Sequence, residues 1–249
     1  MPTYRDKGIV LRKRTLRDAD CHYTVFTEHH GKIVLLAKGS RRGKSKMSPH
    51  MGTLGVVDIM VAEGRVIDRL AGAALIRPFA GLFGSLPKLT AAQGFLLAVD
   101  ALTRRDLPEE RIYRLLISFL EALESAREEE GTRTPVFDAA AIKLFEALGL
   151  AMELGCCVRC RQPLTRFGNA MNVVAGGIEC PSCRDPAAMD VSAEAVETMR
   201  LLRRADLSSV AGQALAMRVR REVGFIVDLA LSAHLETRLP ALKYIQSVA

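Results

Sequence analysis

Tryptophan is absent from this 249-residue sequence, and aromatic residues make up only 5% of it. Proteins that bind single-stranded nucleic acid by stacking bases on rings need several exposed aromatic side chains. The main aromatics of the expected strands are Tyr4, Tyr23 and Phe26, and we expect some of them to be buried. Any binding of nucleic acid should therefore depend on charge, with weak sequence specificity and tolerance of both single and double strands.

Long apolar segments are also lacking. No run reaches the roughly eighteen apolar residues that span a membrane. No apolar segment follows the charged start MPTYRDKG, as a signal peptide would require. We therefore expect a cytoplasmic protein, associated with the nucleoid if its partner is DNA. Six cysteines in that compartment are more often reduced or metal-bound than paired in disulfides.

Positive charge is concentrated at the start of the chain. The formal net charge of the whole sequence is +7, yet residues 1–50 alone hold 12 Lys and Arg against 4 Asp and Glu, a net +8. Nucleic acid is the commonest partner for such asymmetry, and an anionic membrane surface or an acidic protein are the alternatives.

The first third of the chain has the composition of β-strands. Alternating β-branched and aromatic residues, with turns at Glu28–Gly31 and at Glu63-Gly64, predict five strands in about 75 residues. This number suggests a small barrel, although periodicity alone does not separate a barrel from a sandwich. The expected strands are Gly8–Lys13, Cys21–Thr27, Lys32–Ala37, Thr53–Ala62 and Arg65–Leu75.

Helical patterns follow Pro78 and predict an α+β protein with domains at 1–78 and 79–249. The second expected helix has one apolar face, formed by Ile112, Leu115, Leu116, Phe119, Leu120 and Leu123. Later apolar positions, namely Met199, Leu202, Met217 and Phe225, are also expected in the core. The capping and stop signals predict five helices. They cover 91–105, a segment from Pro108 onward, Thr134-Pro135 to Leu148, Ser192 to Arg204, and Ser208–Leu235. Thr90 is the expected cap of the first of them.

Five of the six cysteines lie within 28 residues, in a segment at about 155–187 that interrupts the helical pattern. Cys157-Val-Arg-Cys160 and Cys180-Pro-Ser-Cys183 form two CxxC pairs separated by nineteen residues. This is the spacing of a Cys₄ zinc site, because each CxxC turn presents two thiolates as two corners of a tetrahedron. Cys156 is an alternative first ligand, although it is more simply a packed thiol, and Cys21 is expected in the core.

The cysteine pattern favours structural Zn²⁺ over catalysis, since four thiolates leave no open coordination position. Zinc nucleobase deaminases place H-x-E before P-C-x-x-C, whereas here His234-Leu-Glu236 follows both pairs. No other pattern indicates catalytic residues. His29 and His30 read as a solvated turn, and we expect the protein not to be an enzyme.

A basic loop follows the third expected strand. Residues 38–46 hold five cations, no acid, two Gly and two Ser, so that small neighbours let cations approach a phosphate backbone. Gly39-x-x-x-Gly43-Lys44-Ser45 is one residue too short for a nucleotide-binding P-loop. The alternative is a merely solvated loop, but the basic stretch that ends the first strand could extend the same patch. The candidate DNA-binding residues are Arg12, Lys13, Arg14, Arg17, Lys38, Arg41, Arg42, Lys44 and Lys46.

Several motifs, in this order, resemble the bacterial recombination mediator family RecO. They are Gly8-Ile-Val-Leu, the segment from Gly31 through Ala37-Lys-Gly-Ser-Arg-Arg42, Cys157-x-x-Cys160 and Gly176-Gly177-x-x-Cys180-x-x-Cys183. The resemblance spans nearly the whole chain. It implies an N-terminal OB-fold, a helical C-terminal domain with an inserted zinc finger, annealing of DNA strands and, with RecR, loading of RecA onto DNA coated by the single-stranded-DNA-binding protein.

Two other functions compete with DNA binding. A protein-interaction module whose basic face meets an acidic partner would bind an acidic peptide tightly and DNA weakly. A zinc-dependent nucleic-acid enzyme would need clustered acids or a His–carboxylate pair, which the sequence pattern does not indicate.

Overall fold

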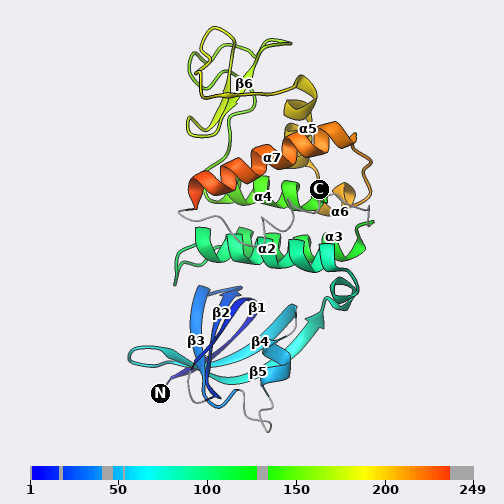
Figure 1. Cartoon of the computed structure of the whole chain (residues 1–249). Helices are drawn as coiled ribbons and strands as arrows, with labels where there is room; N and C mark the ends of the chain where they lie inside the picture. Colours follow the sequence, from blue (N-terminus) through cyan, green and yellow to red (C-terminus); the bar gives the residue numbers. More distant parts are fainter. Residues whose placement is uncertain (1, 17–18, 41–46, 53, 128–133, 236–249) are drawn as a thin grey trace. The chain divides into compact units, whose positions relative to one another are not determined.

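The computed structural model describes residues 2–16, 19–40, 47–52, 54–127 and 134–235. It divides into two compact units, Met1–Leu120 and Glu121–Ala249. The first contains the β-domain and the helices that follow it, and the second contains the remaining helices and a small sheet (Figure 1). The predicted α+β class, with a five-stranded domain followed by helices, is confirmed.

Five strands close into a barrel in the order β1-β2-β3-β5-β4. Each strand pairs with two neighbours, and all pairs are antiparallel except β3 with β5. The strands are β1 Thr3–Thr15, β2 Cys21–Thr27, β3 Gly31–Ala37, β4 Gly55–Ala62 and β5 Asp68–Pro78. The barrel core is aliphatic apart from Tyr23 and the Cys21 thiol, both without exposed surface.

The predicted turn at Glu63-Gly64 is wrong. Residues 63–67 form a longer connection, and β5 begins only at Asp68. The Gly64 amide donates to Oδ1 of Asp68 (2.9 Å), and a Cβ on Gly64 would lie 2.0 Å from the carbonyl oxygen of Ile67. The chain therefore folds back on itself before the strand starts, which the sequence pattern did not reveal.

Helix α2 begins earlier than predicted, and two short helical segments that were not predicted precede it. Helix α1 (Ser48–Met51) and the 3₁₀ turn η2 (Ala80–Gly84) precede α2 (Leu86–Leu102). The cap of α2 is Ser85, whose hydroxyl accepts from the Lys88 amide, so the prediction of a cap at Thr90 is wrong. Thr90 lies inside the helix, where its hydroxyl donates to the Leu86 carbonyl.

Helix α3 (Glu110–Ser125) buries the predicted apolar face. All six residues of that face are at most 9% exposed. Phe119 packs against Phe95 of α2, with ring centroids 4.3 Å apart. The 3.6-residue period alone therefore located this face correctly.

The second unit contains α4 (Pro135–Ala147), α5 (Ala193–Arg204), α6 (Leu207–Val210) and α7 (Met217–His234). Thr134 and Ser192 cap α4 and α5 as predicted, and Gly149 adopts φ +73° after α4. The prediction of one helix over Ser208–Leu235 is wrong. Residues 211–216 separate α6 from α7, and Gly212 in that gap is a poor helix former.

The core prediction for the last helices holds in part. Met199 and Leu202 of α5 are buried, but Met217 and Phe225 of α7 are 43% and 52% exposed. An apolar stripe on a helix does not show which of its members the neighbouring helices cover. No described helix is long and apolar enough to cross a membrane.

A three-stranded sheet of order β7-β6-β8 consists of two strands of the cysteine-rich segment and one strand directly after it. Its strands are β6 Ala170–Asn172, β7 Gly177–Glu179 and β8 Met189–Asp190. We call residues 155–187 the finger. Its strands are too short to bury much apolar surface, so its shape depends on other interactions.

Candidate metal centre and nucleic-acid interface

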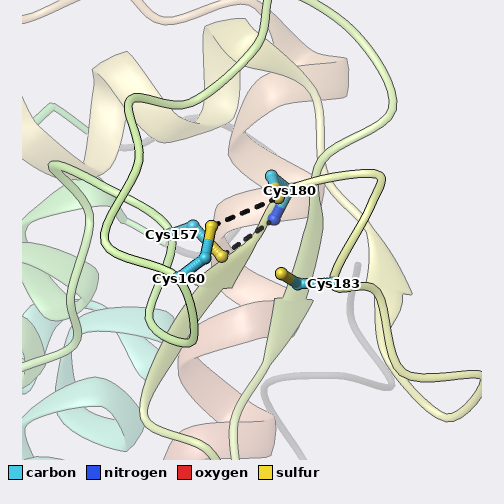
Figure 2. A group of neighbouring side chains, drawn as sticks. All are labelled: Cys157, Cys160, Cys180 and Cys183. Carbon is cyan, nitrogen blue, oxygen red and sulfur yellow. Dashed lines mark hydrogen bonds between the residues drawn. The ribbon is translucent and has the colours of Figure 1, made fainter.

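The four predicted metal ligands meet in the finger. The Sγ atoms of Cys157, Cys160, Cys180 and Cys183 all lie within 4.8 Å of one another (Figure 2). Sγ of Cys160 is 3.8 Å from Sγ of Cys180. Four sulfurs at about 2.3 Å from a central Zn²⁺ would be separated by roughly 3.8 Å. The donor set and its spacing therefore fit a tetrahedral metal ion.

Backbone hydrogen bonds shape the two cysteine turns. The Arg161 amide donates to the Cys157 carbonyl (2.9 Å), and the Cys183 amide donates to the Cys180 carbonyl (2.9 Å). The Cys180 amide also donates to Sγ of Cys157 (3.4 Å), which joins one turn to the other. Arg161 adopts φ +62°, a left-handed conformation that closes the first turn. The ligands are thus held together by the chain itself.

The thiols of the cluster differ in acidity because they lie so close together. Burial opposes ionisation of Cys157, but amide donors from Cys160, Cys180 and Arg159 outweigh it and lower its pKa to about 6. Hydrogen bonds with Cys160 and Cys180 raise the pKa of Cys183 to about 12. One thiolate therefore forms readily and opposes the ionisation of its neighbours. A divalent cation would remove that repulsion.

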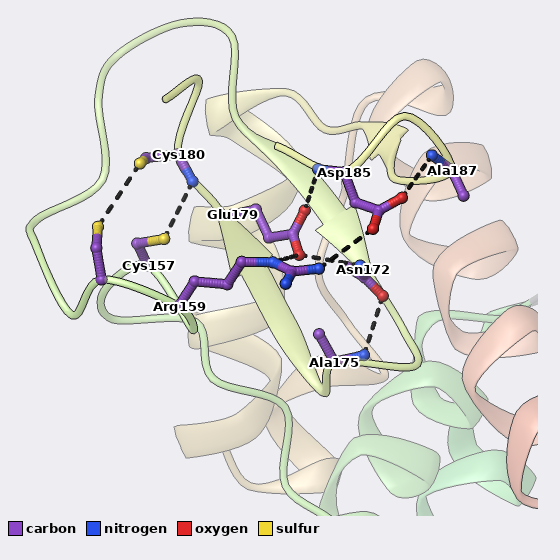
Figure 3. A network of polar contacts seen from close by, with 9 residues as sticks. Cys157, Arg159, Asn172, Ala175, Glu179, Cys180, Asp185 and Ala187 are labelled. Atoms are coloured by element: carbon purple, nitrogen blue, oxygen red, sulfur yellow. Dashed lines mark hydrogen bonds and ion pairs between the residues drawn. The ribbon is translucent and has the colours of Figure 1, made fainter. Parts of the chain in front are cut away.

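A buried carboxylate joins the two cysteine turns (Figure 3). Glu179 has no exposed side-chain surface and accepts from Arg159 Nε (2.5 Å), Asn172 Nδ2 (2.9 Å) and the Asp185 amide (2.7 Å). Burial alone would raise the pKa of Glu179, but these donors lower it. Arg159 lies inside the first CxxC turn and Asp185 follows the second. Sequence reasoning missed this role, although a lone acid directly before a CxxC pair is a usable signal.

The remaining cysteines lie outside the cluster. Cys21 is completely buried in the barrel, as predicted. Cys156 is half-buried and does not belong to the group of four, so the spatial arrangement favours Cys157 as the first ligand.

Strand register brings part of the predicted basic patch together. Thr15 of β1 pairs with Cys21 of β2, and Cys21 pairs with Ala37 of β3. The ends of β1 and β3 therefore lie at the same end of the barrel, with only β2 between them. Lys13 and Arg14 precede Thr15, and Lys38 follows Ala37. All three cations are exposed. Arg17, Arg41, Arg42, Lys44 and Lys46 lie outside the described residues.

The start of the basic loop is anchored to the barrel. The Gly39 amide donates to Oδ1 of Asp20 (2.6 Å), and the buried Ser40 hydroxyl lies 3.0 Å from the Tyr23 hydroxyl. The ammonium of Lys13 lies over the Tyr23 ring, 5.7 Å from its centroid. These contacts link the loop start to the end of β1. Sequence reasoning missed Asp20 and Ser40, because the signal lies only in their spatial proximity.

Arg12 differs from its neighbours. Its Nε is 3.0 Å from Oδ2 of Asp100 on α2, although 55% of its side chain remains exposed. The same carboxylate is 3.4 Å from the ammonium of Lys32, whose side chain is only 8% exposed. Lys32 also donates to the carbonyls of Asp100 and Thr103 at the end of α2 (2.5 Å each). Arg12 therefore belongs to a junction between barrel and helix as well as to the basic stretch.

The aromatic residues of the strands form no stacking surface. Tyr23 and Phe26 are buried, and Tyr4 stacks on His30 with ring centroids 4.1 Å apart. The interpretation of His29 and His30 as a merely solvated turn is wrong, because Nδ1 of each ring bonds to the buried carboxylate of Asp6 (3.0 and 2.6 Å).

Glu28 joins Asp6 and His29 in a second group of metal-capable atoms within 4.8 Å of one another. The Asp6 carboxylate already accepts from the amides of Lys7 and His29 in addition to the two imidazoles. We therefore assign this group a structural role in the turn and no ion.

Comparison with known proteins extends over the whole chain. The family model described as "Recombination protein O N terminal" matches residues 1–79, and that described as "Recombination protein O C terminal" matches residues 84–243. The chain belongs to the RecO family. Proteins of this family are named for DNA repair and recombination, and the cysteine cluster adds a candidate metal site to that assignment.

Curated RecO proteins match three quarters or more of the chain. "DNA repair protein RecO" of Frankia casuarinae is 34% identical over 99% of both chains. The protein of the same name from Cutibacterium acnes is 31% identical over 99% of this chain and all of its own length. That of Rubrobacter xylanophilus is 33% identical over 76% of this chain and 75% of its own. Both units therefore carry the resemblance to RecO.

Proposed function

We propose that this chain is a DNA-binding recombination mediator. Residues 1–78 would form an OB-fold domain that binds single- and double-stranded DNA and brings complementary strands together. Residues 79–249 would form the helical domain, with the finger at about 155–187 as a zinc-binding insertion. The closed strand order, in which β1 pairs with both β2 and β4 and β3 with β5, supports the OB-fold assignment.

The observation that carries the proposal is the common location of exposed cations at one end of the barrel. Lys13 and Arg14 lie next to the end of β1, and Lys38 begins the basic loop after β3, with only β2 between these two strands. With Arg17, Arg41, Arg42, Lys44 and Lys46 they make the densest positive charge of the sequence. Cations in that arrangement bind phosphates of either strand without reading bases.

Annealing follows from charge screening and needs no covalent step. Two strands repel each other through their phosphates, and a cationic surface that holds both lowers this repulsion. No nucleotide would be consumed, since the loop lacks the P-loop spacing. We propose that the protein is not an enzyme and acts in the cytoplasm on nucleoid DNA.

Zinc is the ion that the four thiolates suit best. Cys157, Cys160, Cys180 and Cys183 would hold Zn²⁺ in a closed tetrahedral site, which braces the finger and leaves no position for substrate. The family assignment supports RecR and the single-stranded-DNA-binding protein as partners, with RecA loaded onto the strand. No residues are assigned to those contacts.

Annealing of complementary oligonucleotides without nucleotide tests the proposal. The intact protein should accelerate pairing, and if about five cations contact phosphates, the logarithm of affinity should fall against the logarithm of salt with a slope near −3.5 to −4.5. Replacing Lys38, Arg41, Arg42 and Lys44 with Ala should slow annealing and flatten that slope. A matched variant removes four exposed arginines outside the barrel, Arg104, Arg111, Arg204 and Arg218. Equal slopes for both variants would contradict the proposal.

A further inference from the structure

The finger displays one aromatic ring to solvent. Phe167 is 75% exposed, more than any other phenylalanine that the structure describes, and it lies between Arg166 and Gly168. This exposure keeps an apolar ring in contact with water, and a partner that stacks on the ring would cover that surface. Neither the metal centre nor the basic end of the barrel uses this residue.

Several hydrogen bonds connect the residues of the loop that carries Phe167. The side chain of Asn169, which is only 4% exposed, accepts from the Thr165 amide (3.3 Å) and donates to the Thr165 carbonyl (2.5 Å). The Thr165 hydroxyl lies 2.7 Å from the Phe167 carbonyl oxygen. Hydrogen bonds to a buried asparagine thus tie the two ends of this loop together.

The same loop rests against the metal centre. Gly168 adopts φ +78°, and a Cβ there would lie 3.1 Å from Cγ of Pro181, which stands inside the second CxxC turn. A side chain at position 168 would meet both a disfavoured backbone conformation and this proline. The loop that displays the ring therefore packs against the second cysteine turn.

Charge beside the ring indicates the kind of partner. The Arg166 guanidinium carbon lies over the Phe167 ring, 5.3 Å from its centroid. Residues 161–168, RQPLTRFG, contain two arginines and no acid, but Arg161 is paired with Glu153 (3.0 Å), so Arg166 is the cation beside the ring. A flat apolar ring next to exposed positive charge suits an unpaired nucleobase, which can stack on the ring while its phosphate meets the cation.

We propose that the loop Thr165–Gly168 is a second contact for single-stranded DNA, in which Phe167 stacks on one unpaired base and Arg166 binds the adjacent phosphate. The inference rests on the proposed function in that the chain must bind DNA, but it locates a contact that the basic loop does not provide. Duplex DNA hides its base faces, so this contact distinguishes single strands, whereas the barrel charge does not.

The absence of tryptophan makes the test direct. A Phe167→Trp variant has a single tryptophan, whose fluorescence should be quenched when a base stacks on it. We expect strong quenching by an oligothymidine strand and little by a duplex of equal length. Phe225→Trp, at the half-exposed Phe225 of α7, is the matched control and should not respond.

Affinity measurements separate stacking from general apolar contact. Phe167→Ala should weaken binding of the single strand by roughly five- to a hundred-fold and leave duplex binding unchanged. Phe167→Leu keeps apolar bulk without an aromatic ring, and its affinity for the single strand should fall nearly as much. The zinc content and the melting temperature of both variants should equal those of the wild type. If wild-type protein binds DNA but these variants bind equally well and the tryptophan signal stays constant, the inference is wrong and the proposed function stands. If wild-type protein does not bind DNA, the proposed function itself fails.

Discussion

Arg159 Nε lies 2.5 Å from Oε1 of Glu179, and this pair connects the first cysteine turn to the strand that leads into the second. Glu179 is fully buried, whereas 47% of the Arg159 side chain is exposed. The carboxylate also holds Asn172 and the Asp185 amide, so its removal would leave three donors without their acceptor. Loss of a buried acceptor of this kind costs about 1–3 kcal/mol.

Glu179→Gln should therefore loosen the finger without removing any thiolate. We expect the apparent zinc affinity to fall, because part of the binding free energy would be spent on ordering the two turns. Competition with a metallochromic chelator measures this. Asp190→Asn is the matched control, since Asp190 pairs with Arg184 at the surface with 82% of its side chain exposed. Equal affinities for the two variants would show that Glu179 does not hold the site.

The adjacent cysteines Cys156 and Cys157 allow a sharp test of the ligand set. Cys157→Ser should abolish stoichiometric zinc binding, because its thiolate is one of the four clustered donors. Cys156→Ser should retain about one zinc ion per chain. Elemental analysis after gel filtration distinguishes them, and the reverse result would make Cys156 the ligand. Chelation of wild-type protein should expose residues 155–187 to protease while the barrel stays folded.

Arg12 and Arg14 lie two residues apart on β1 and should behave differently. Arg14→Ala should lower the salt slope of DNA binding by about 0.7–0.9, the share of one phosphate contact. Arg12→Ala should change the slope less, because Arg12 is paired with Asp100. Its effect on stability should stay below about 1 kcal/mol, since 55% of the Arg12 side chain is exposed and Lys32 still holds the carboxylate. Fluorescence polarisation across a salt series measures both slopes. A larger slope change for Arg12→Ala than for Arg14→Ala would contradict this prediction.

The pair of His29 and Asp6 should make the stability of the barrel depend on pH. The hydrogen bond to Asp6 raises the pKa of His29 above 6.5. Burial opposes ionisation of Asp6, but bonds from His30 and His29 lower its pKa below 3.8. Their mutual stabilisation is therefore fully present between pH 3.8 and 6.5. It is lost as pH rises through the raised pKa of His29, and as pH falls through the lowered pKa of Asp6.

Melting temperatures of wild type and His29→Gln, compared across pH, measure this contribution. The difference should be largest near the middle of that window and should shrink above pH 6.5. Because 70% of the His29 side chain is exposed, high salt should reduce the difference. A difference that does not vary with pH would show that the pair carries no charge.

Much of the fold could be predicted from local patterns. The alternation of Cys21–Thr27 and the 3.6-residue period from Ile112 to Leu123 each reflect one element with one buried face, so they located β2 and the core of α3. Thr134 and Ser192 were identifiable as caps, because a cap acts on the amide two or three residues ahead. The ends of β5 and the break after α6 escaped prediction, since folded-back backbone and helix packing decide them.

The sequence by itself determined the donor set and the charge, because CxxC spacing and a run of cations are local properties. Only the tertiary structure decided which of these groups act together. Pairing of β1, β2 and β3 brought Lys13 and Arg14 to the start of the basic loop, and α2 gave Arg12 a carboxylate that lies 88 positions later in the chain. The burial of Glu179 and the display of Phe167 likewise depend on long-range contacts. The physical reason is that burial and pairing are properties of neighbours in space, which a one-dimensional pattern does not specify.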